Sequence, residues 1–341
     1  MKTILVTGGT GYIGSHTVVE LQSAGFKVVI IDNLSNSSAD VVDKITNITG
    51  TRPDFEQIDC LDYKGLQDVF KKHVGISAVI HFAASKAVGE SVIKPLLYYR
   101  NNLQSLLNLL EVMIATGTTN FVFSSSCTVY GQPDILPVTE EAPIKPAVSP
   151  YGNTKQICEE IVRDTIHSGA AIKSILLRYF NPIGAHTSGE IGELPRGIPQ
   201  NLVPFITQTA AGIREELQVF GDDYDTPDGS CIRDYIDVVD LARAHVIAVQ
   251  RLIDKRNETP VEIFNLGTGR GLSVLELIHI FREATGETVP YRIANRRAGD
   301  IEKVWANPQR ANDVLGWKAK ESIQNTLLSA WNWEKNIRGM R

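Results

Sequence analysis

The feature that most constrains the fold is a glycine-rich turn that follows a short apolar run. Residues 2–6 form that run, which contains β-branched side chains, and Gly8, Gly11 and Gly14 come after it at three-residue spacing. Residues 12–24 then read as a helix. Glycines let the backbone turn tightly and approach a pyrophosphate, whose charge meets the N-terminus of the helix. The pattern predicts the first strand, loop and helix of a dinucleotide-binding unit.

An acidic residue at the end of the next predicted strand indicates which dinucleotide is bound. Residues 28–31 form the apolar run, and Asp32 ends it. This acid lies roughly 20 positions after Gly14, where a carboxylate can bind the hydroxyls of the adenosine ribose. Asp32 would repel a 2′-phosphate, and neither Arg nor Lys lies between it and Asp43. We therefore expect NAD rather than NADP.

The rest of the chain continues the alternation of strands and helices. Four further apolar runs are separated by helical patterns, at residues 55–58, 78–84, 121–126 and 174–180. Continuous apolar strands separated by helices indicate a parallel sheet covered on both faces. The expected fold is α/β, a Rossmann-type doubly wound parallel sheet with a smaller α/β substrate-binding domain. We assign residues 1–180 to the NAD-binding domain and 181–341 to the substrate domain, with about 234–265 returning to the first.

A serine at a strand end and a Tyr-x-x-x-Lys pair supply the parts for removing a proton from an alcohol. Ser126 ends a predicted strand, and Tyr151 and Lys155 are spaced to share one face of a helix. Ser149 and Pro150 are the expected N-cap and first residue of that helix. Free tyrosine titrates near pH ~10, whereas a general base works best near ~7. We expect Lys155, the helix N-terminus and an oxidised nicotinamide to lower the pKa of Tyr151.

Each of these signals is weak alone, because glycines are common in loops and Tyr and Lys are ordinary half-exposed residues. Their order along one chain favours the functional interpretation, since the glycine loop, the acid, the serine and the Tyr-Lys helix follow one another as one doubly wound sheet would place them.

Composition disfavours several other classes of protein. A chain of 341 residues with 43% hydrophobic content can bury a large core, and a net charge of -5 gives no sign of nucleic-acid binding. No apolar run approaches the length of a membrane span. The 4 cysteines show no Cys-x-x-Cys spacing, so we expect reduced thiols, a cytoplasmic location and no metal site.

Further segments extend the pattern over nearly the whole chain. They are residues 87–91 (Ala-Val-Gly-Glu-Ser), 178–182 (Arg-Tyr-Phe-Asn-Pro), 197–199 (Gly-Ile-Pro), 233–235 (Arg-Asp-Tyr) and 265–267 (Asn-Leu-Gly). From Thr3 to about Trp333 the chain resembles the UDP-glucose 4-epimerase family of extended short-chain dehydrogenases/reductases.

The resemblance implies interconversion of UDP-glucose and UDP-galactose without net redox change. In that family a permanently bound NAD+ takes hydride from C4 of the hexose, and the 4-keto sugar then turns over and receives the hydride on its other face. By this resemblance Tyr151 is the base for the O4 proton, Lys155 lowers its pKa and holds the nicotinamide ribose, and Ser126 hydrogen-bonds O4. We call these three residues the Ser–Tyr–Lys group.

The resemblance also implies the substrate-binding residues. Arg233 and Arg297 would bind the diphosphate, a task suited to bidentate guanidinium contacts, while Asn181 and Asn201 would contact the UDP-hexose. Val304 stands where enzymes restricted to glucose and galactose often carry tyrosine. Its smaller side chain leaves room for a 2-acetamido group, so we expect UDP-N-acetylglucosamine and UDP-N-acetylgalactosamine to be accepted as well.

Cofactor-binding residues carried over from the family lie at strand ends or in the loops that follow. They are Gly8, Gly11, Tyr12, Ile13, Gly14, Asp32, Asn33, Asn36, Asp59, Phe82, Ala83, Lys86, Asn101, Tyr151, Lys155 and Phe180. Residues 83–86 read Ala-Ala-Ser-Lys where the family commonly has Ala-Gly-Leu-Lys, which gives a stiffer backbone. Cys127 replaces a usual alanine, and we interpret it as a small buried hydrophobe.

One helix indicates the oligomeric state. Apolar side chains lie round most of the surface of the helical segment 102–115, which therefore needs burial on more than one side. In the family this helix and the Tyr-Lys helix form a two-fold interface. We predict a homodimer.

Other functions use the same parts. A UDP-uronic acid 4-epimerase stays open, because it shares the Tyr and Lys. A 4,6-dehydratase would need an acid pair beside Thr128, which here precedes Val129 and Tyr130. A catalytically weak NAD-binding regulatory protein is disfavoured by the complete Ser–Tyr–Lys group, and copurified NAD near one per chain would speak against a plain alcohol dehydrogenase.

Overall fold

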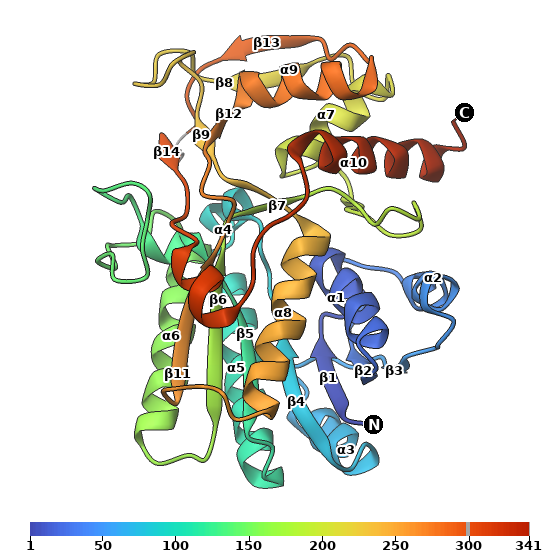
Figure 1. The fold of residues 1–341 in the computed structure, drawn as a ribbon, viewed down its shortest axis with the longest axis vertical. Coiled ribbons are helices and arrows are strands. Elements are labelled where there is room, and N and C mark those ends of the chain that lie inside the picture. Colours follow the sequence, from blue (N-terminus) through green and yellow to red (C-terminus); the bar gives the residue numbers. More distant parts are fainter. Residues whose placement is uncertain (298–300, 341) are drawn as a thin grey trace.

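A parallel sheet forms the central layer of the molecule, in a computed structural model that describes residues 1–297 and 301–340. Within those residues the sheet has seven strands in the order β11-β6-β5-β4-β1-β2-β3 (Figure 1). Their bounds are β1 (Thr3–Thr7), β2 (Lys27–Ile31), β3 (Asp54–Glu56), β4 (Ile76–His81), β5 (Asn120–Ser126), β6 (Lys173–Tyr179) and β11 (Val261–Leu266). The strand order reverses between β1 and β4, and ligands of such sheets bind outside the carboxyl ends at that point. The predicted Rossmann-type fold is confirmed.

Helices cover both faces of this sheet because successive side chains of each strand point to opposite sides. Ile4 and Val6 face the layer that contains α1 (Tyr12–Ser23), α2 (Asp40–Thr49) and α8 (Val238–Ile253). Leu5 faces the layer that contains α3 (Tyr63–Lys72), α5 (Pro95–Thr116) and α6 (Pro150–His167). Burying each such aliphatic side chain contributes roughly 1.5–3 kcal/mol.

Two predicted strands end earlier in the structure than the apolar runs suggested. Strand β4 ends at His81, because its neighbours β1 and β5 pair with it only up to that residue. Residues 82–84 belong instead to the loop above the sheet. Strand β3 ends at Glu56, where its partner β2 ends at Ile31.

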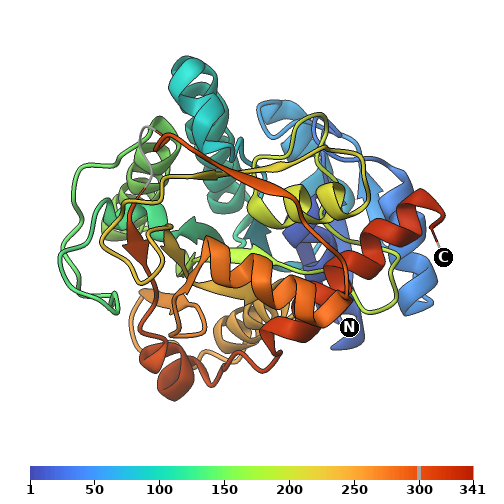
Figure 2. The same cartoon turned by 90° about the horizontal axis from the view of Figure 1, so that it is seen from above.

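A smaller unit lies above the carboxyl ends of the strands (Figures 1 and 2). Its elements are α7 (Leu202–Ala210), β8 (Leu217–Phe220), β9 (Ile232–Arg233), β12 (Leu272–Ser273), α9 (Val274–Thr285), β13 (Tyr291–Ala294), β14 (Lys303–Val304) and α10 (Ile323–Arg338). Ile206, Leu277, Phe281 and Trp331 belong to its apolar core. This unit has its own hydrophobic centre and faces the edge of the sheet where a ligand would bind.

The chain passes between the two units more than once. After β7 (Asn181–Ile183) it enters the smaller unit, and β10 (Tyr235–Asp237) pairs with β7 on the way back. Helix α8 then packs on α1, and β11 joins the sheet beside β6. A cut at residue 180 alone would separate α8 and β11 from the sheet on which they pack. The remaining short elements are α4 (Val88–Ile93), η1 (Cys127–Tyr130) and η2 (Ala311–Leu315).

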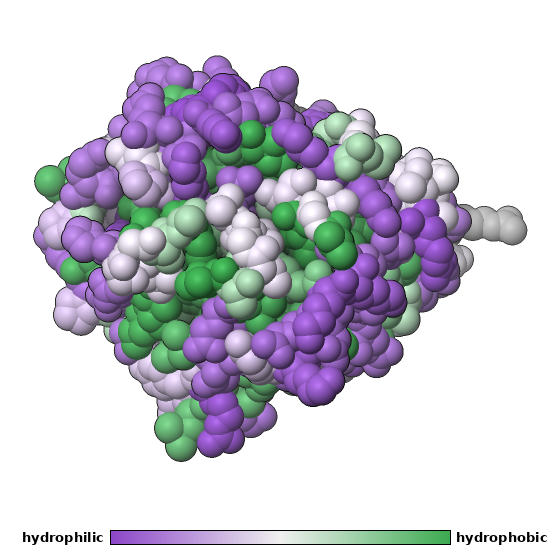
Figure 3. Space-filling model, turned by 90° about the horizontal axis from the view of Figure 1, so that it is seen from below, coloured by the Kyte–Doolittle hydropathy of each residue, from purple (hydrophilic) through white to green (hydrophobic). Residues whose placement is uncertain are grey.

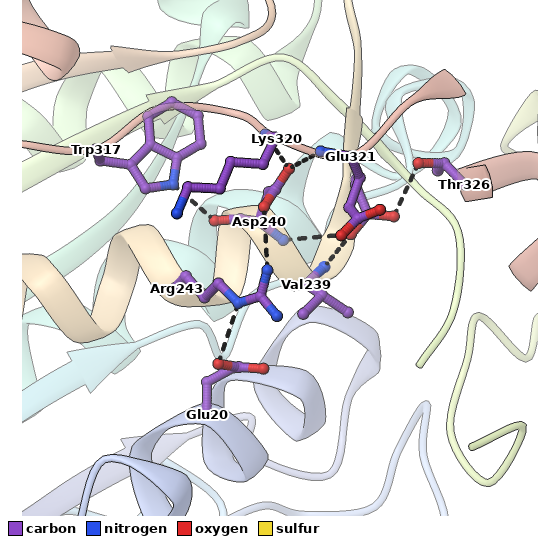
Figure 4. Close-up of polar contacts among 9 residues, drawn as sticks. Glu20, Val239, Asp240, Arg243, Trp317, Lys320, Glu321 and Thr326 are labelled. Atoms are coloured by element: carbon purple, nitrogen blue, oxygen red, sulfur yellow. Dashed lines mark hydrogen bonds and ion pairs between the residues drawn. The ribbon is translucent and has the colours of Figure 1, made fainter. Parts of the chain in front are cut away.

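A polar cluster at the start of α8 ties this helix to the C-terminal segment (Figure 4). Asp237 Oδ1 accepts hydrogen bonds from the backbone N–H groups of Val239 and Asp240, at 2.7 and 3.2 Å. Its Oδ2 accepts one from Thr326 Oγ1 of α10 at 2.9 Å. Asp240 Oδ2 accepts one from the N–H of Lys320 at 2.6 Å. Burial raises the pKa of Asp237 to about 6, and the cluster fixes the smaller unit on a helix of the central layer.

The opposite end of the molecule, where the strands begin, shows apolar residues in the middle of a largely hydrophilic face (Figure 3). Val74, 85% exposed, precedes β4 there. None of the described helices is both long and apolar enough to cross a bilayer.

Candidate active site

The glycine loop after β1 has the geometry that a dinucleotide pyrophosphate requires. Gly8 has φ +72°, and a Cβ on it would lie 2.9 Å from the backbone N of Ala83. A Cβ on Gly14, in the first turn of α1, would lie 2.1 Å from the carbonyl oxygen of Gly8. Gly11 is the N-cap of α1. Only glycine fits at Gly8 and Gly14, because the neighbouring backbone leaves no space for a Cβ. The loop therefore turns tightly onto the N-terminus of α1, as a pyrophosphate site requires, so these residues fit NAD.

The loop after β2 is organised around Asp32, at the adenosine side of the predicted cofactor site. The Asp32 carboxylate accepts hydrogen bonds from Thr10 N at 3.2 Å, Leu34 N at 2.9 Å and Ser37 Oγ at 3.1 Å. Ser37 Oγ also lies 2.7 Å from Thr10 Oγ1. The acid is therefore held between the glycine loop and its own loop.

Two neighbouring residues complete this side. Asn33 Nδ2 donates to Asp59 Oδ2 at 2.8 Å, which joins the loops after β2 and β3, and Asn36 is exposed in the same loop as Asn33. The structure thus brings Asp32, Asn33 and Asp59 to one edge of the sheet.

The loop after β4 carries Phe82, Ala83 and Lys86. The Phe82 ring lies 4.7 Å from that of His245 on α8, and the N–H of Ala83 donates to Thr7 Oγ1 at 3.3 Å. Asn101 Nδ2 donates to Ser85 Oγ at 3.1 Å. These contacts hold the loop at the carboxyl end of β4, beside the glycine loop.

Asn102 is a buried residue that supports the loop after β4, and the sequence did not indicate this role. Its Oδ1 accepts from Ser85 N at 2.8 Å, and its Nδ2 donates to Ser85 O and to Thr154 Oγ1, each at 3.0 Å. Asn102 thereby links the β4 loop to the Tyr-Lys helix. The signal that could have found it is an amide on the buried face of a leucine-rich helix, which must be hydrogen-bonded to be tolerated.

The Ser–Tyr–Lys group meets at the carboxyl end of β5. Ser126 is the last residue of β5, and Tyr151 lies in the first turn of α6. The predicted cap is confirmed, because Ser149 Oγ accepts from Gly152 N at 3.1 Å and Pro150 is the first helical residue. All three members of the group are buried.

Lys155 is held under Tyr151 by the end of β5. Its Nζ donates to the carbonyl oxygen of Ser124 at 2.6 Å and lies 5.9 Å from the centre of the Tyr151 ring. Burial lowers the pKa of Lys155 to about 8. The ammonium thus keeps its position through a backbone carbonyl, on the face of α6 that Tyr151 shares.

The electrostatics of Tyr151 differ from the expectation. Burial raises the pKa of its phenol, nearby Tyr179 raises it further, and a hydrogen bond with Ser126 opposes the shift. Desolvation outweighs the favourable groups because the charged phenolate loses its water. The chain alone therefore does not lower the pKa of Tyr151 toward neutrality.

A buried ion pair anchors the Tyr-Lys helix from behind. Glu159, one turn after Lys155, accepts from Arg178 Nε at 2.8 Å and Nη2 at 2.5 Å, and from Ser125 Oγ at 2.5 Å. Arg178 Nη1 donates to Tyr130 Oη at 3.0 Å. No role was predicted for these residues from the sequence. A Glu spaced four after Lys155 is the only local signal, and it is equally common on solvated helices.

The substrate side is built around β9 and β14. Strand β14 pairs with β9, which places Val304 opposite Arg233. Val304 is buried in an apolar cluster with Phe180, and Cys127 packs against that cluster. Arg233 Nη1 donates to the carbonyl oxygen of Ile232 at 2.9 Å. Val304 and Arg233 thus lie near the turn that follows Ser126, and burial raises the pKa of the Cys127 thiol to about 12.

The other predicted substrate residues lie in three different places. Asn181 begins β7 next to β10, and Asn201 is the N-cap of α7. Arg297 is exposed, with its guanidinium 5.4 Å from the centre of the Phe220 ring. Its place opposite a diphosphate stays a prediction.

Glu193 is a further residue that the sequence did not indicate. Its carboxylate accepts from Lys86 Nζ at 3.3 Å and from Asn201 Nδ2 at 2.6 Å. It therefore joins a predicted cofactor residue to a predicted substrate residue. No local motif marks Glu193, because Lys86 lies 107 positions away in the sequence.

No group of three or more His, Cys, Asp and Glu side chains in residues 1–297 and 301–340 could hold a metal ion.

The fold and the site define a dinucleotide-binding α/β protein with the Ser, Tyr and Lys arrangement of the short-chain dehydrogenases/reductases. The family model described as GDP-mannose 4,6 dehydratase matches residues 5–329. A UDP-glucose 4-epimerase of Mus musculus is 49% identical over 341 residues, which cover 98% of this chain and 97% of the relative. The chain therefore belongs to the extended short-chain dehydrogenase/reductase family that this model describes and, within it, to the UDP-glucose 4-epimerases.

Solved structures agree over the full length. A UDP-glucose 4-epimerase from Stenotrophomonas maltophila, with bound NAD and formylated UDP-arabinopyranose, superposes with a TM-score of 0.96 at 48% identity and 99% coverage of both chains. The enzyme from Bifidobacterium longum, in complex with NAD+ and UDP, gives a TM-score of 0.94 at 46% identity and 98% coverage of both chains.

Proposed function

We propose that this chain interconverts UDP-glucose and UDP-galactose by inverting C4 of the hexose, with NAD held in the glycine-loop site. The observation that carries the proposal is the meeting of Ser126, Tyr151 and Lys155 at the end of β5, at the same edge of the sheet as the glycine loop after β1. NAD, when bound, supplies the acceptor and later the donor of the hydride at C4. Family membership with relatives of that activity supports the assignment.

The residues of the chain handle the proton and the orientation of the sugar. Tyr151 takes the O4 proton as the C4–H bond breaks and returns it to O4 when that bond re-forms on the other face. Ser126 donates a hydrogen bond to O4. Since burial raises the pKa of Tyr151, the base needs nearby positive charge, which Lys155 and an oxidised nicotinamide would supply.

The sugar has to turn while the nucleotide stays fixed. We assign Arg233 and Arg297 to the diphosphate, and Asn181 and Asn201 to the rest of the UDP-hexose. Charge-assisted contacts to the diphosphate can hold the nucleotide while the hexose, with fewer polar partners, rotates.

We further propose that the acetylated sugars UDP-N-acetylglucosamine and UDP-N-acetylgalactosamine are substrates. Val304 supports this, because it lies opposite Arg233 and packs near the turn after Ser126. A valine leaves more room than a tyrosine would at that position.

A homodimer and a cytoplasmic location complete the proposal. Helices α5 and α6 pack side by side, and α5 leaves Leu107 and Ile114 37% and 50% exposed, an apolar face that a second copy would cover. A monomeric mass at micromolar concentration would contradict the dimer. The four cysteines are free, as a reducing compartment requires.

The test is to incubate the purified protein, without added NAD, with UDP-galactose and separately with UDP-N-acetylgalactosamine, and to resolve the products by chromatography. Conversion of both supports both proposals, and conversion of UDP-galactose alone removes the acetylated substrates. Conversion of neither favours a UDP-uronic acid epimerase or a non-catalytic protein.

Tyr151→Phe is the matching variant. It keeps the ring and removes the proton acceptor, so we expect the rate to fall by about 10²–10⁴. Tyr291→Phe, at a tyrosine that is 48% exposed in the smaller unit, is the control and should keep the wild-type rate.

A further inference from the structure

Residues 184–201 run from the C-terminal helix to the loops of the predicted cofactor site, and we call this segment the strap. Its helix side is held at three points on α10. Ala185 N donates to Ser329 Oγ at 3.0 Å, Asn336 Nδ2 donates to Gly189 O at 2.6 Å, and Trp333 Nε1 donates to Glu193 O at 3.1 Å. The strap is thus attached along one edge to a helix of the smaller unit.

The other edge of the strap contacts two loops of the predicted cofactor site, the glycine loop after β1 and the loop after β4. Tyr12 Oη, next to the glycine loop, donates to Gly184 O at 2.7 Å. Lys86 Nζ, after β4, donates to Glu193 Oε1 at 3.3 Å. The glycine loop was assigned to the pyrophosphate, and Lys86 to the cofactor.

A third contact reaches the adenosine side. Arg196 Nη1 donates to Ser35 O at 3.2 Å, and Nη2 donates to Ser37 O. Ser37 Oγ is itself a donor to Asp32, so Arg196 holds the same loop that positions the ribose-binding acid. The strap therefore contacts three of the loops that would surround a dinucleotide, those after β1, β2 and β4.

The fit between strap and glycine loop is close. The cavity bounded by Tyr12, Gly184, Glu193 and Trp333 measures about 10 Å³, room for one water at most. Trp333 is buried at the helix edge, whereas Lys86 and Arg196 are exposed at the cofactor edge. The strap therefore separates more easily from the loops after β2 and β4, where solvent competes for the contacts of Arg196 and Lys86.

We propose that the strap closes over the bound dinucleotide and that Arg196 and Glu193 set the rate at which the cofactor leaves. The proposal rests on the proposed function, because it takes NAD as the ligand. It adds two retention residues to the site, neither of which touches the reacting atoms.

The experiment measures cofactor release rather than turnover. The full-length protein is loaded with isotope-labelled NAD, chased with excess unlabelled NAD, and sampled over time for retained label after rapid desalting. Arg196→Ala removes both contacts to the loop at residues 35–37. Glu193→Gln keeps an amide oxygen for Asn201 but removes the charge that faces Lys86. Arg256→Ala, at an exposed arginine paired with Asp254, is the control.

We expect Arg196→Ala and Glu193→Gln each to release NAD about tenfold faster than the wild type, a change of about 1.4 kcal/mol in the barrier, with Arg256→Ala unchanged. Salt of about 1 M should speed release from the wild type and have less effect on Glu193→Gln, because it screens the ion pair that this variant lacks. If Arg196→Ala releases NAD as slowly as the wild type, the strap proposal is overturned and the proposed function is not. A wild-type protein that binds no dinucleotide would overturn both the strap and the proposed function.

Discussion

A buried ion pair holds the Tyr-Lys side of the candidate site, whereas a partly exposed ion pair holds the strap on the cofactor side. Behind the Tyr-Lys helix, the Arg178 and Glu159 side chains are 1% and 3% exposed and form two hydrogen bonds with each other and more with their neighbours. At the strap, Lys86 meets Glu193 through a single 3.3 Å contact, and the lysine side chain is 46% exposed.

This difference matches the tasks of the two sides. Tyr151 and Lys155 must stay within a small distance of the sugar, and a buried, fully hydrogen-bonded pair holds their helix against two strands. A cofactor has to enter before it can be kept, so the strap needs contacts that solvent can replace. Buried and exposed ion pairs differ in the cost of breaking them, at about 3–5 and 0–1 kcal/mol respectively.

Removing one partner of the buried pair should have the largest effect. Arg178→Met removes the buried cation that donates two hydrogen bonds to Glu159 and leaves the carboxylate with the partly exposed Arg163, at 3.1 Å. We therefore expect the free energy of unfolding to fall by about 3–5 kcal/mol in urea titrations. Turnover of the molecules that stay folded should fall too, because α6 carries Tyr151 and Lys155. Arg251→Met is the matched control. Arg251 forms a buried pair with Glu262, at 2.7 and 2.8 Å, away from the Ser–Tyr–Lys group, so the free energy of unfolding should fall and turnover should not. Equal loss of turnover in both variants would contradict a positioning role for Arg178.

The buried His245 makes the stability of the protein depend on pH, in a way that an exposed histidine would not. Burial lowers the pKa of His245 to about 4, whereas an unfolded histidine titrates near pH ~6.5. The unfolded chain thus binds more protons below that pH, and stability falls as the pH drops from 6.5 toward 4. His245→Phe should remove roughly 3 kcal/mol of that loss, measured by urea titration at several pH values. Curves that stay parallel for the two proteins would contradict the assignment.

Substitutions at Val304, on the substrate side, should change which UDP-sugar the enzyme prefers. Val304→Tyr fills the space assigned to the acetamido group, so we expect the rate on UDP-N-acetylgalactosamine to fall by about 10–200-fold relative to UDP-galactose. Val304→Ala keeps that space and should keep both reactions. A Tyr variant that loses both substrates equally would place Val304 in packing alone.

The exposed side should show the smallest change in stability. Glu193→Gln, measured by urea titration with saturating NAD, should alter the free energy of unfolding by less than about 1 kcal/mol, because solvent screens the contact with Lys86. A loss of several kcal/mol would mean that the strap supports the fold itself, and the contrast between the two sides would fail.

Local patterns in the sequence were sufficient to predict most of the sheet, its helices and the motifs at the strand ends. The glycine spacing, the acid after β2 and the cap at Ser149 and Pro150 depend on residues within a few turns of one another, and the structure has them as predicted. The same holds for the alternation of strands and helices, since each element has its own apolar period. Strand ends were less well predicted, because β4 stops at His81, where its pairing with β1 and β5 ends, and not where its apolar run does.

Only the tertiary structure decided what surrounds those motifs. Glu193 lies 107 positions from Lys86, and Arg196 lies 161 from Ser35, so neither contact has a local signature. The raised pKa of Tyr151 likewise comes from the number of atoms packed around it. A sequence determines which chemical groups are present and how each element starts and ends, whereas desolvation and pairing across the site depend on which distant segments the fold brings together.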